Sequence, residues 1–172
     1  MAAPRIQVEI VDDCVAVIRP GPILSSQDWP GFEAAYRHVY DTLDHFVLAF
    51  DLQQISMPPV DMITSTLDLI TVMRPRTSRQ VIGVVVLTPY ESVCKLVSHY
   101  LKVKGQVAPF HLVSDARAAA QAISRMANII RKAPGLDPTE AHLLTFGELS
   151  FGCYLALLVL TFMRMQVYFI GC

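Results

Sequence analysis

The sequence lacks an excess of charge of either sign. Its 14 lysine and arginine residues are balanced by 15 aspartate and glutamate residues, which gives a formal net charge of −1. Proteins that bind nucleic acid without regard to sequence usually carry a clear basic excess, because the phosphate backbone is their main contact. The balance therefore excludes a general nucleic-acid binder, and we expect no nucleic-acid partner.

Cysteine is also scarce, and its spacing carries no metal or redox motif. The chain has Cys14, Cys94, Cys153 and Cys172, none of them in a CxxC pair and none at metal-ligand spacing from a histidine. The N-terminal segment MAAPRIQVEI lacks the basic start and apolar run of a signal peptide. We therefore expect a cytoplasmic domain, or one in another reducing compartment, whose cysteines are thiols.

The common catalytic motifs are missing. There is no GxxxxGKS/T, GxGxxG or GxSxG segment, so the usual phosphate-binding loops and the nucleophile elbow are absent. His38 and His45 share a predicted helix, but no acidic residue completes a metal site with them. Ser98 and His99 are adjacent on a predicted helix, where neighbouring side chains diverge. We expect no enzymatic activity, no cofactor and no metal ion.

Apolar residues that are present form patterns typical of an α/β domain. Alternation at residues 6–10 and 14–18, with a turn at Asp12-Asp13, predicts a hairpin, and apolar runs at 46–50 and 81–87 predict buried strands. A short strand is expected at 110–113. Periodic apolar residues predict helices at 28–45, 60–73, 88–103 and 116–131. This order predicts a mixed, mainly parallel sheet with an N-terminal hairpin and four flanking helices.

Proline sets the expected end of the second long helix. The residue before a proline disfavours the α region, so Arg74-Pro75 is expected to stop the helix that begins near Val60. Arg74, Arg76 and Arg79 then fall in one loop. Guanidinium groups clustered in a loop suit a phosphate or an acidic partner. The alternative is a solvated loop. The position of the loop favours this alternative, because ligands of α/β proteins usually bind at the opposite ends of the strands.

Three segments carry a resemblance to the STAS domain, the fold of bacterial anti-sigma-factor antagonists. They are FVLAFDLQQIS at 46–56, VIGVVVLTP at 81–89 and APFHLVSDARAAAQAI at 108–123. The resemblance extends over nearly all of residues 5–131. It implies a non-catalytic protein-interaction or regulatory module that binds a protein partner through the loop after Asp51 and the helix that follows.

The resemblance also draws attention to a serine that is missing. Regulatory STAS antagonists are phosphorylated on a serine at the start of the helix after the Asp-Leu strand. The matching place here reads Pro59-Val60-Asp61-Met62 and holds no serine. We interpret Asp61 as part of the helix start, where a carboxylate is favoured, rather than as a permanent substitute for a phosphate. Partner switching by serine phosphorylation is therefore not expected.

The same segments are similar to the CRAL-TRIO lipid-binding domain, which is the second choice. Asp51–Ser56, Arg74-Pro75 and Thr88-Pro89 match its pattern. We rank STAS first because the stretch between Ile18 and Phe46 is short for a CRAL-TRIO domain. The CRAL-TRIO resemblance implies a carrier or sensor of a lipid or another apolar ligand.

The ends of the predicted parallel strands are the expected partner surface, because α/β proteins bind there. The residues that we assign to this surface are Asp51, Ser56, Asp61, Met62, Thr88 and Tyr90.

A hydrophobic tail follows the domain. From Leu149 to Cys172 the only charged residue is Arg164, and the span reaches the roughly 20 residues that a bilayer requires. Three interpretations stay open: a C-terminal membrane anchor with the domain on the cytoplasmic side, a helix buried against a partner or the domain, and a chain end outside any selected fold. We divide the chain into a domain at 5–132, a linker at 133–142 and the tail at 143–172.

Overall fold

The computed structural model describes residues 5–55, 59–135, 137–138 and 140–142. Within them the chain forms a five-stranded sheet in the order β1-β2-β3-β4-β5, with β1 antiparallel to β2 and the other pairs parallel. The strands are β1 (Ile6–Val11), β2 (Val15–Pro20), β3 (Phe46–Asp51), β4 (Val81–Leu87) and β5 (Phe110–Val113). The predicted mixed, mainly parallel sheet with an N-terminal hairpin is confirmed.

The hairpin turns on the two aspartates identified in the sequence. Asp12 and Asp13 both have positive φ, 52° and 54°, and Cys14 N donates to Val11 O at 3.3 Å. Two successive left-handed residues form the centre of a β-turn over residues 11–14, and aspartate tolerates this conformation. The turn places Val11 opposite Val15 and so sets the register of β1 and β2.

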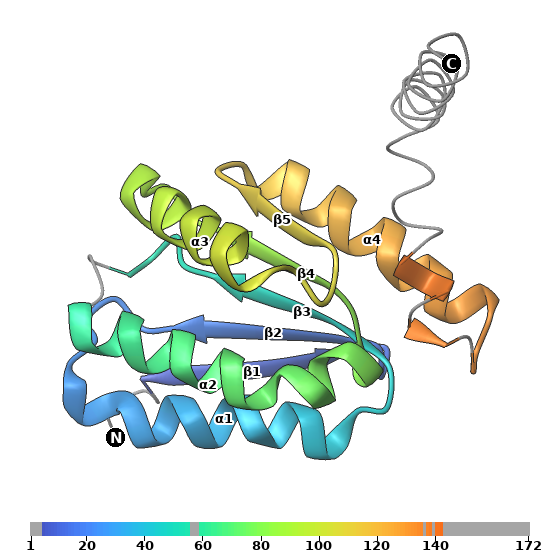
Figure 1. Cartoon of the computed structure of the whole chain (residues 1–172), viewed down its shortest axis with the longest axis horizontal. Helices are drawn as coiled ribbons and strands as arrows, with labels where there is room; N and C mark the ends of the chain where they lie inside the picture. The colour runs from blue at the N-terminus through green and yellow to red at the C-terminus, as the bar shows by residue number, and fades with distance from the viewer. Residues whose placement is uncertain (1–4, 56–58, 136, 139, 143–172) are drawn as a thin grey trace, which may run out of the picture.

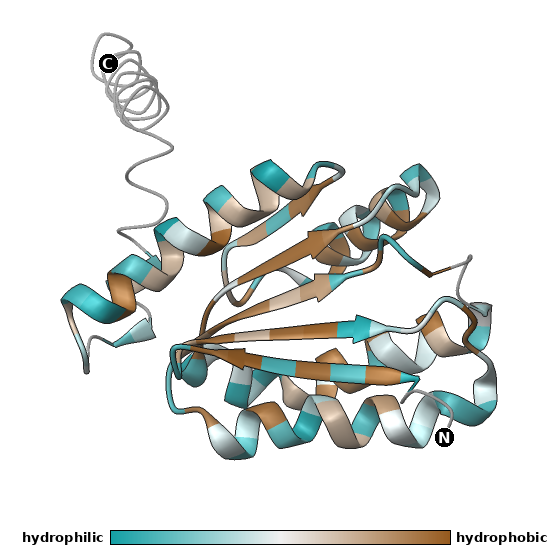
Figure 2. Cartoon of the chain, turned by 180° about the vertical axis from the view of Figure 1, so that it is seen from behind, coloured by the Kyte–Doolittle hydropathy of each residue, from teal (hydrophilic) through white to brown (hydrophobic). Residues whose placement is uncertain are grey.

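Helices cover both faces of the sheet (Figures 1 and 2). They are the short 3-10 helix η1 (Ser26–Asp28) and the α-helices α1 (Trp29–Thr42), α2 (Val60–Gln80), α3 (Glu91–Lys104) and α4 (Ala116–Lys132). In β3, Phe46, Leu48 and Phe50 pack in the core with α1 and α2, while Val47 and Ala49 pack in the core with α4. The uninterrupted apolar run of β3 is therefore explained by cover on both faces.

The predicted stop of the second helix at Arg74-Pro75 is wrong, because α2 continues through Pro75 to Gln80. A proline in a helix leaves the carbonyl of the residue four positions earlier, here Thr71, without its helical partner. Pro75 and Thr71 are both exposed, so water can satisfy that carbonyl. Met73 and Thr77, which flank Pro75, are buried and hold the helix to the domain.

Helix ends follow the sequence signals closely at α3 and α4. Gly105 ends α3 with φ of 75°, a conformation that glycine adopts without strain at the end of a helix. Asp115 caps α4, and its carboxylate accepts hydrogen bonds from Arg117 N and Ala118 N at 3.1 and 3.0 Å. Asp28 precedes α1, but its carboxylate accepts from Ser25 N instead and makes no cap bond to α1.

The chain continues to pack against the domain after α4. Ala141 is fully buried with the α4 side of the core, and His142 Nε2 lies 2.9 Å from Val81 O. The division at residue 132 stays a prediction, and the tail at 143–172 with its three interpretations lies outside the described residues. No helix in the described ranges is both long and apolar enough to cross a membrane. Cys14 and Cys94 are free thiols.

Candidate functional site

The carboxyl ends of the parallel strands meet at one edge of the sheet. Backbone hydrogen bonds continue beyond the strands, from Leu52 N to Leu87 O at 2.8 Å and from Thr88 N to Val113 O at 2.9 Å. The loops that leave β3 and β4 are thereby fixed to each other. This edge is the usual place for a functional surface in an α/β protein.

Asp51, the last residue of β3, is bonded within its own chain. Its Oδ1 accepts from Gln53 N at 3.2 Å, which forms a local turn, and its Oδ2 accepts from Arg19 Nε at 3.4 Å. Arg19 also pairs with Glu9. The Asp51 side chain is 27% exposed, so it contributes to the surface while its carboxylate organises the loop after β3.

Asp61 is exposed in the first turn of α2, and its carboxylate accepts a hydrogen bond from the hydroxyl of Ser26 in η1. That hydrogen bond, opposed in part by desolvation, lowers the pKa of Asp61. The carboxylate is therefore charged at neutral pH and joins the start of α2 to η1. This geometry agrees with a helix-start role for Asp61.

The remaining predicted surface residues do not all reach the surface. Met62 and Thr88 are only 4% and 1% exposed, so their assignment to a partner surface is wrong. Met62 is on the inward side of α2, and Thr88 is covered where β4 ends, beside β5. Tyr90 is half-buried, and its hydroxyl donates to Ile55 O at 2.6 Å. Ser56 lies outside the described residues.

One surface residue was missed by the sequence reasoning. Ile23 is 75% exposed and stands beside a hollow of about 500 Å³. The hollow is lined by Arg5, Gln7, Arg19, Pro20, Gly21, Pro22, Ile23, Asp51 and Gln54. The available signal was an apolar residue directly after the Pro-Gly-Pro segment, where the chain can neither continue a strand nor bury its side chains in a helix.

The three arginines predicted in one loop lie on α2 and point to different neighbours. Arg74 Nη1 donates to Lys104 O at the end of α3, whereas Arg76 Nη1 donates to Asp41 at 2.8 Å at the end of α1. Arg79 Nε donates to Pro75 O within α2. The structure does not bring the three guanidinium groups together, so the hypothesis of a shared anion site finds no support in it.

An apolar cavity of about 160 Å³ lies between the sheet and the helices α1, α2 and α3. Its walls include Phe50 and Val86 from the strands, Ile70 from α2 and Val97 from α3. The few polar side chains in the walls are used internally. Thr66, for example, donates to Met62 O at 2.7 Å. A cavity with this lining offers an apolar ligand burial without unsatisfied polar atoms.

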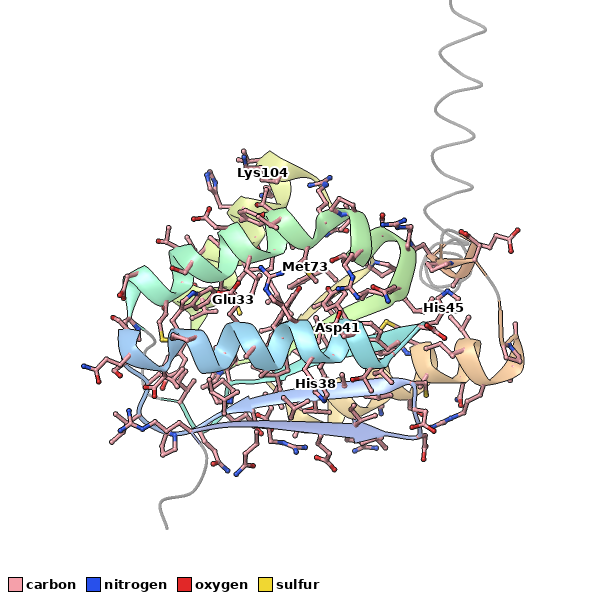
Figure 3. All side chains as sticks on the ribbon, turned by 90° about the horizontal axis from the view of Figure 1, so that it is seen from below. Glu33, His38, Asp41, His45, Met73 and Lys104 are labelled. Atoms are coloured by element: carbon pink, nitrogen blue, oxygen red, sulfur yellow. The ribbon has the colours of Figure 1, made fainter. Side chains whose placement is uncertain are left out.

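Histidines and acidic residues are dispersed. In the described ranges, no three His, Cys, Asp or Glu side chains lie where they could hold one metal ion. His38 on α1 and His45 after it are set apart from each other, as Figure 3 shows. Burial, with a smaller contribution from the Arg125 charge, lowers the pKa of His111.

Comparison with known proteins shows the fold. No family model matches the chain, and no curated protein matches it significantly. A solved structure of an uncharacterised DUF3478-family protein with a SpoIIAA-like fold, from Shewanella loihica, aligns with a TM-score of 0.51 and 13% identity over 69% of this chain and 91% of that one. The chain therefore has the SpoIIAA-like fold, and the predicted STAS resemblance is confirmed at the level of fold. The similarity to CRAL-TRIO domains stays a prediction.

Two further structures align with lower scores. An anti-sigma factor antagonist from Mycobacterium paratuberculosis has a TM-score of 0.48 and 20% identity, over 72% of this chain and 97% of that one. The unphosphorylated anti-sigma factor antagonist SpoIIAA has a TM-score of 0.45 and 14% identity, over 70% and 97%.

Proposed function

We propose that this chain is a non-catalytic docking module that binds a protein partner through the surface around Ile23, at the carboxyl ends of β2 and β3. The observation that carries the proposal is the 75% exposure of Ile23 beside a hollow of about 500 Å³. Protein interfaces combine an apolar anchor with a surrounding rim of polar groups. An exposed isoleucine next to a hollow whose lining includes Arg5, Arg19 and Asp51 has that arrangement.

Internal ion pairs hold the rim of this surface in place. Arg5 Nη1 lies 3.1 Å from Asp28 Oδ2, and Arg19 bonds both Asp51 and Glu9. Side chains that are fixed before binding lose less conformational entropy when a partner arrives. The same pairing supports a docking role over catalysis, because these charged groups are already engaged with one another.

Site-specific photo-crosslinking tests the proposal. A photoreactive residue at position 23 is expected to capture a protein partner, whereas one at position 103 is not. Val103 is 66% exposed and lies at the end of α3, so it is matched in apolar character and accessibility. With the captured partner purified, Ile23→Glu should weaken binding about ten-fold or more, and Val103→Glu should leave it unchanged. Equal affinity for both variants and the native chain would refute the proposal.

The predicted tethering by residues 143–172 would place this docking module at a membrane. Because Ala141 and His142 pack on the domain, the matched comparison is the full-length chain against one ending at His142. Tethering predicts that only the full-length chain sediments with membranes and resists extraction by carbonate. If both chains stay in the supernatant, the tethering is refuted and the docking proposal is unaffected.

A second candidate function, the carriage or sensing of an apolar ligand, is favoured by one specific observation. The cavity under α2 and α3 measures about 160 Å³, comparable with an apolar cavity of about 150 Å³ that stays dry and binds benzene. Pro20 lines both this cavity and the hollow beside Ile23, and the other lining residues differ, so one molecule could carry both functions. Binding of a six-carbon apolar compound to the full-length chain tests this candidate.

A further inference from the structure

We infer that the cavity binds a small monocarboxylic acid, with its apolar chain inside and its carboxylate on Arg74 at the rim. This inference rests on the second candidate function, because it names the class of apolar ligand that the cavity would take. Three features carry it: the interior, the polar groups in its walls, and the charge at its opening.

The interior selects the size and the apolar character of the ligand. The cavity is lined by residues from three helices and four strands, among them Phe50, Val86, Ile70, Val97 and Phe110. Its volume of about 160 Å³ suits roughly one six-membered ring or a chain of about six carbons. Each buried methylene adds about 0.8 kcal/mol, so such a chain has enough surface for measurable binding.

The polar groups in the walls exclude a polar ligand body. The hydroxyl of Thr77 donates to Met73 O at 3.1 Å, and that of Tyr100 donates to Leu67 O at 3.2 Å. Among the described residues no buried side-chain nitrogen or oxygen lacks a partner. A polar group inside the cavity would lose its hydration without a replacement, so a polar head must stay at the opening.

The charge at the opening is positive. Arg74 lines the cavity and is half-buried, and its Nη1 donates to Lys104 O at 2.6 Å and Gly105 O at 3.3 Å. Both bonds use one nitrogen of a group that has five N–H donors. In the described part of the chain no carboxylate pairs with Arg74, whereas Arg76 on the same helix pairs with Asp41. A guanidinium held at an apolar opening without a carboxylate is complementary to the head of an acid.

The experiment compares hexanoate with 1-hexanol on the full-length chain in detergent-free buffer, by saturation-transfer NMR titration. The two probes share the apolar chain and differ in the head. We expect hexanoate to bind about three-fold tighter, the factor that corresponds to an exposed ion pair of about 0.7 kcal/mol. Acetate, which has the head without the chain, should not bind.

Substitutions separate the cavity from the charge. Val97→Phe fills the cavity and should lower the affinity for both probes at least five-fold. Arg74→Gln should lower the affinity for hexanoate to that for hexanol and leave the affinity for hexanol unchanged. Arg74→Lys should retain most of the preference for hexanoate over hexanol. Arg79→Gln is the matched control, because Arg79 is on the same helix and is not among the residues that line the cavity. Circular dichroism of each variant establishes that it is folded.

The outcomes distinguish two failures. If neither hexanoate nor hexanol binds, both the inference and the second candidate function are refuted. If hexanol binds as well as hexanoate, or if Arg79→Gln lowers hexanoate affinity as much as Arg74→Gln, the apolar-ligand function stands and the acid specificity is refuted.

Discussion

The two faces of the sheet are packed in different ways. On the α4 face, the helix lies directly on the strands through the small residues Ala119, Ala122 and Ala127. Met126 reaches so close to β4 that a Cβ on Gly83 would lie 2.1 Å from its sulfur. On the opposite face a cavity of about 160 Å³ separates α2 and α3 from the sheet. The comparison teaches that the size of the facing side chains sets how closely a helix approaches a sheet.

Helix α2 is held from the side as well as by its buried residues Met62, Leu69 and Met73. Tyr40 Oη on α1 lies 2.9 Å from the hydroxyl of Thr77 on α2, and Arg37 Nη1 lies 3.8 Å from Met73 Sδ. Figure 3 shows Met73 between α1 and α2. On the other side the hydroxyl of Tyr100 on α3 donates to a carbonyl of α2. These lateral contacts brace α2 against its neighbours, so the cavity below it stays open.

The largest expected effect comes from removing a side chain on the closely packed face. Met126 is fully buried, and Met126→Ala should lower the free energy of unfolding by about 3 kcal/mol, since a cavity remains in a tight core. Ile70→Ala removes a similar volume from a wall that is already open, and should cost about 1 kcal/mol or less. Urea denaturation measures both. Equal losses would mean that the two faces are packed equally well.

The second-largest expected effect tests how closely Met126 of α4 approaches Gly83 of β4. Gly83→Ala should lower the free energy of unfolding by about 2 kcal/mol, because Met126 must move from its place against β4. Gly31→Ala in α1 is the control, since the nearest atom to its new Cβ is Ile6 Cδ1 at 3.8 Å. Alanine favours a helix, so the control should be neutral or slightly stabilising. A neutral Gly83→Ala would show that the end of the Met126 side chain moves away from β4 at little cost.

Removal of a single hydroxyl group should weaken the lateral contacts of α2. Tyr40→Phe removes the bonds of this hydroxyl to Thr77 and to Tyr36 in a buried site, and should cost about 1–2 kcal/mol in thermal or urea unfolding. Thr42→Ala, which removes an exposed hydroxyl bond to His38 O within α1, should cost less than about 0.5 kcal/mol. If the two variants lose the same stability, the polar bracing is not what holds α2.

Much of the fold could be predicted because local patterns decide it. The Asp12-Asp13 turn and the apolar run of β4 are each specified by neighbouring residues, and the structure confirms both predictions. The end of α2 could not be predicted in this way. Local preference at Pro75 opposes the helix, and buried Thr77, bonded to Tyr40 from another helix, overrides it.

The candidate site was predicted less well than the fold. That the partner surface lies at this edge of the sheet stays a prediction. Thr88 is buried there, where its N–H donates to Val113 O of β5, and burial of this kind depends on residues distant in sequence. The cavity was not predictable at all. Periodicity shows which side of α2 is apolar, yet the distance between that side and the sheet depends on contacts with α1 and α3.

The smallest expected effect concerns pH and the α4 face. Burial, with a smaller effect of the Arg125 charge, lowers the pKa of His111 on β5 from its ordinary 6.5, so the folded chain favours neutral imidazole. The unfolded chain takes up the proton first as pH falls, and stability present above about pH 6.5 is lost below it. His111→Gln should reduce this loss between about pH 7.5 and 5.5 by a few tenths of a kcal/mol in urea unfolding.

Arg125→Gln sharpens the same test, because it removes the charge while leaving the imidazole in place. In an NMR titration it should raise the pKa of His111 part of the way toward the ordinary value. Burial is the larger cause, so most of the depression should remain. A pKa of His111 that is ordinary in the native chain would mean that water reaches this histidine, and that the face covered by α4 is less closed at β5 than it is at Gly83.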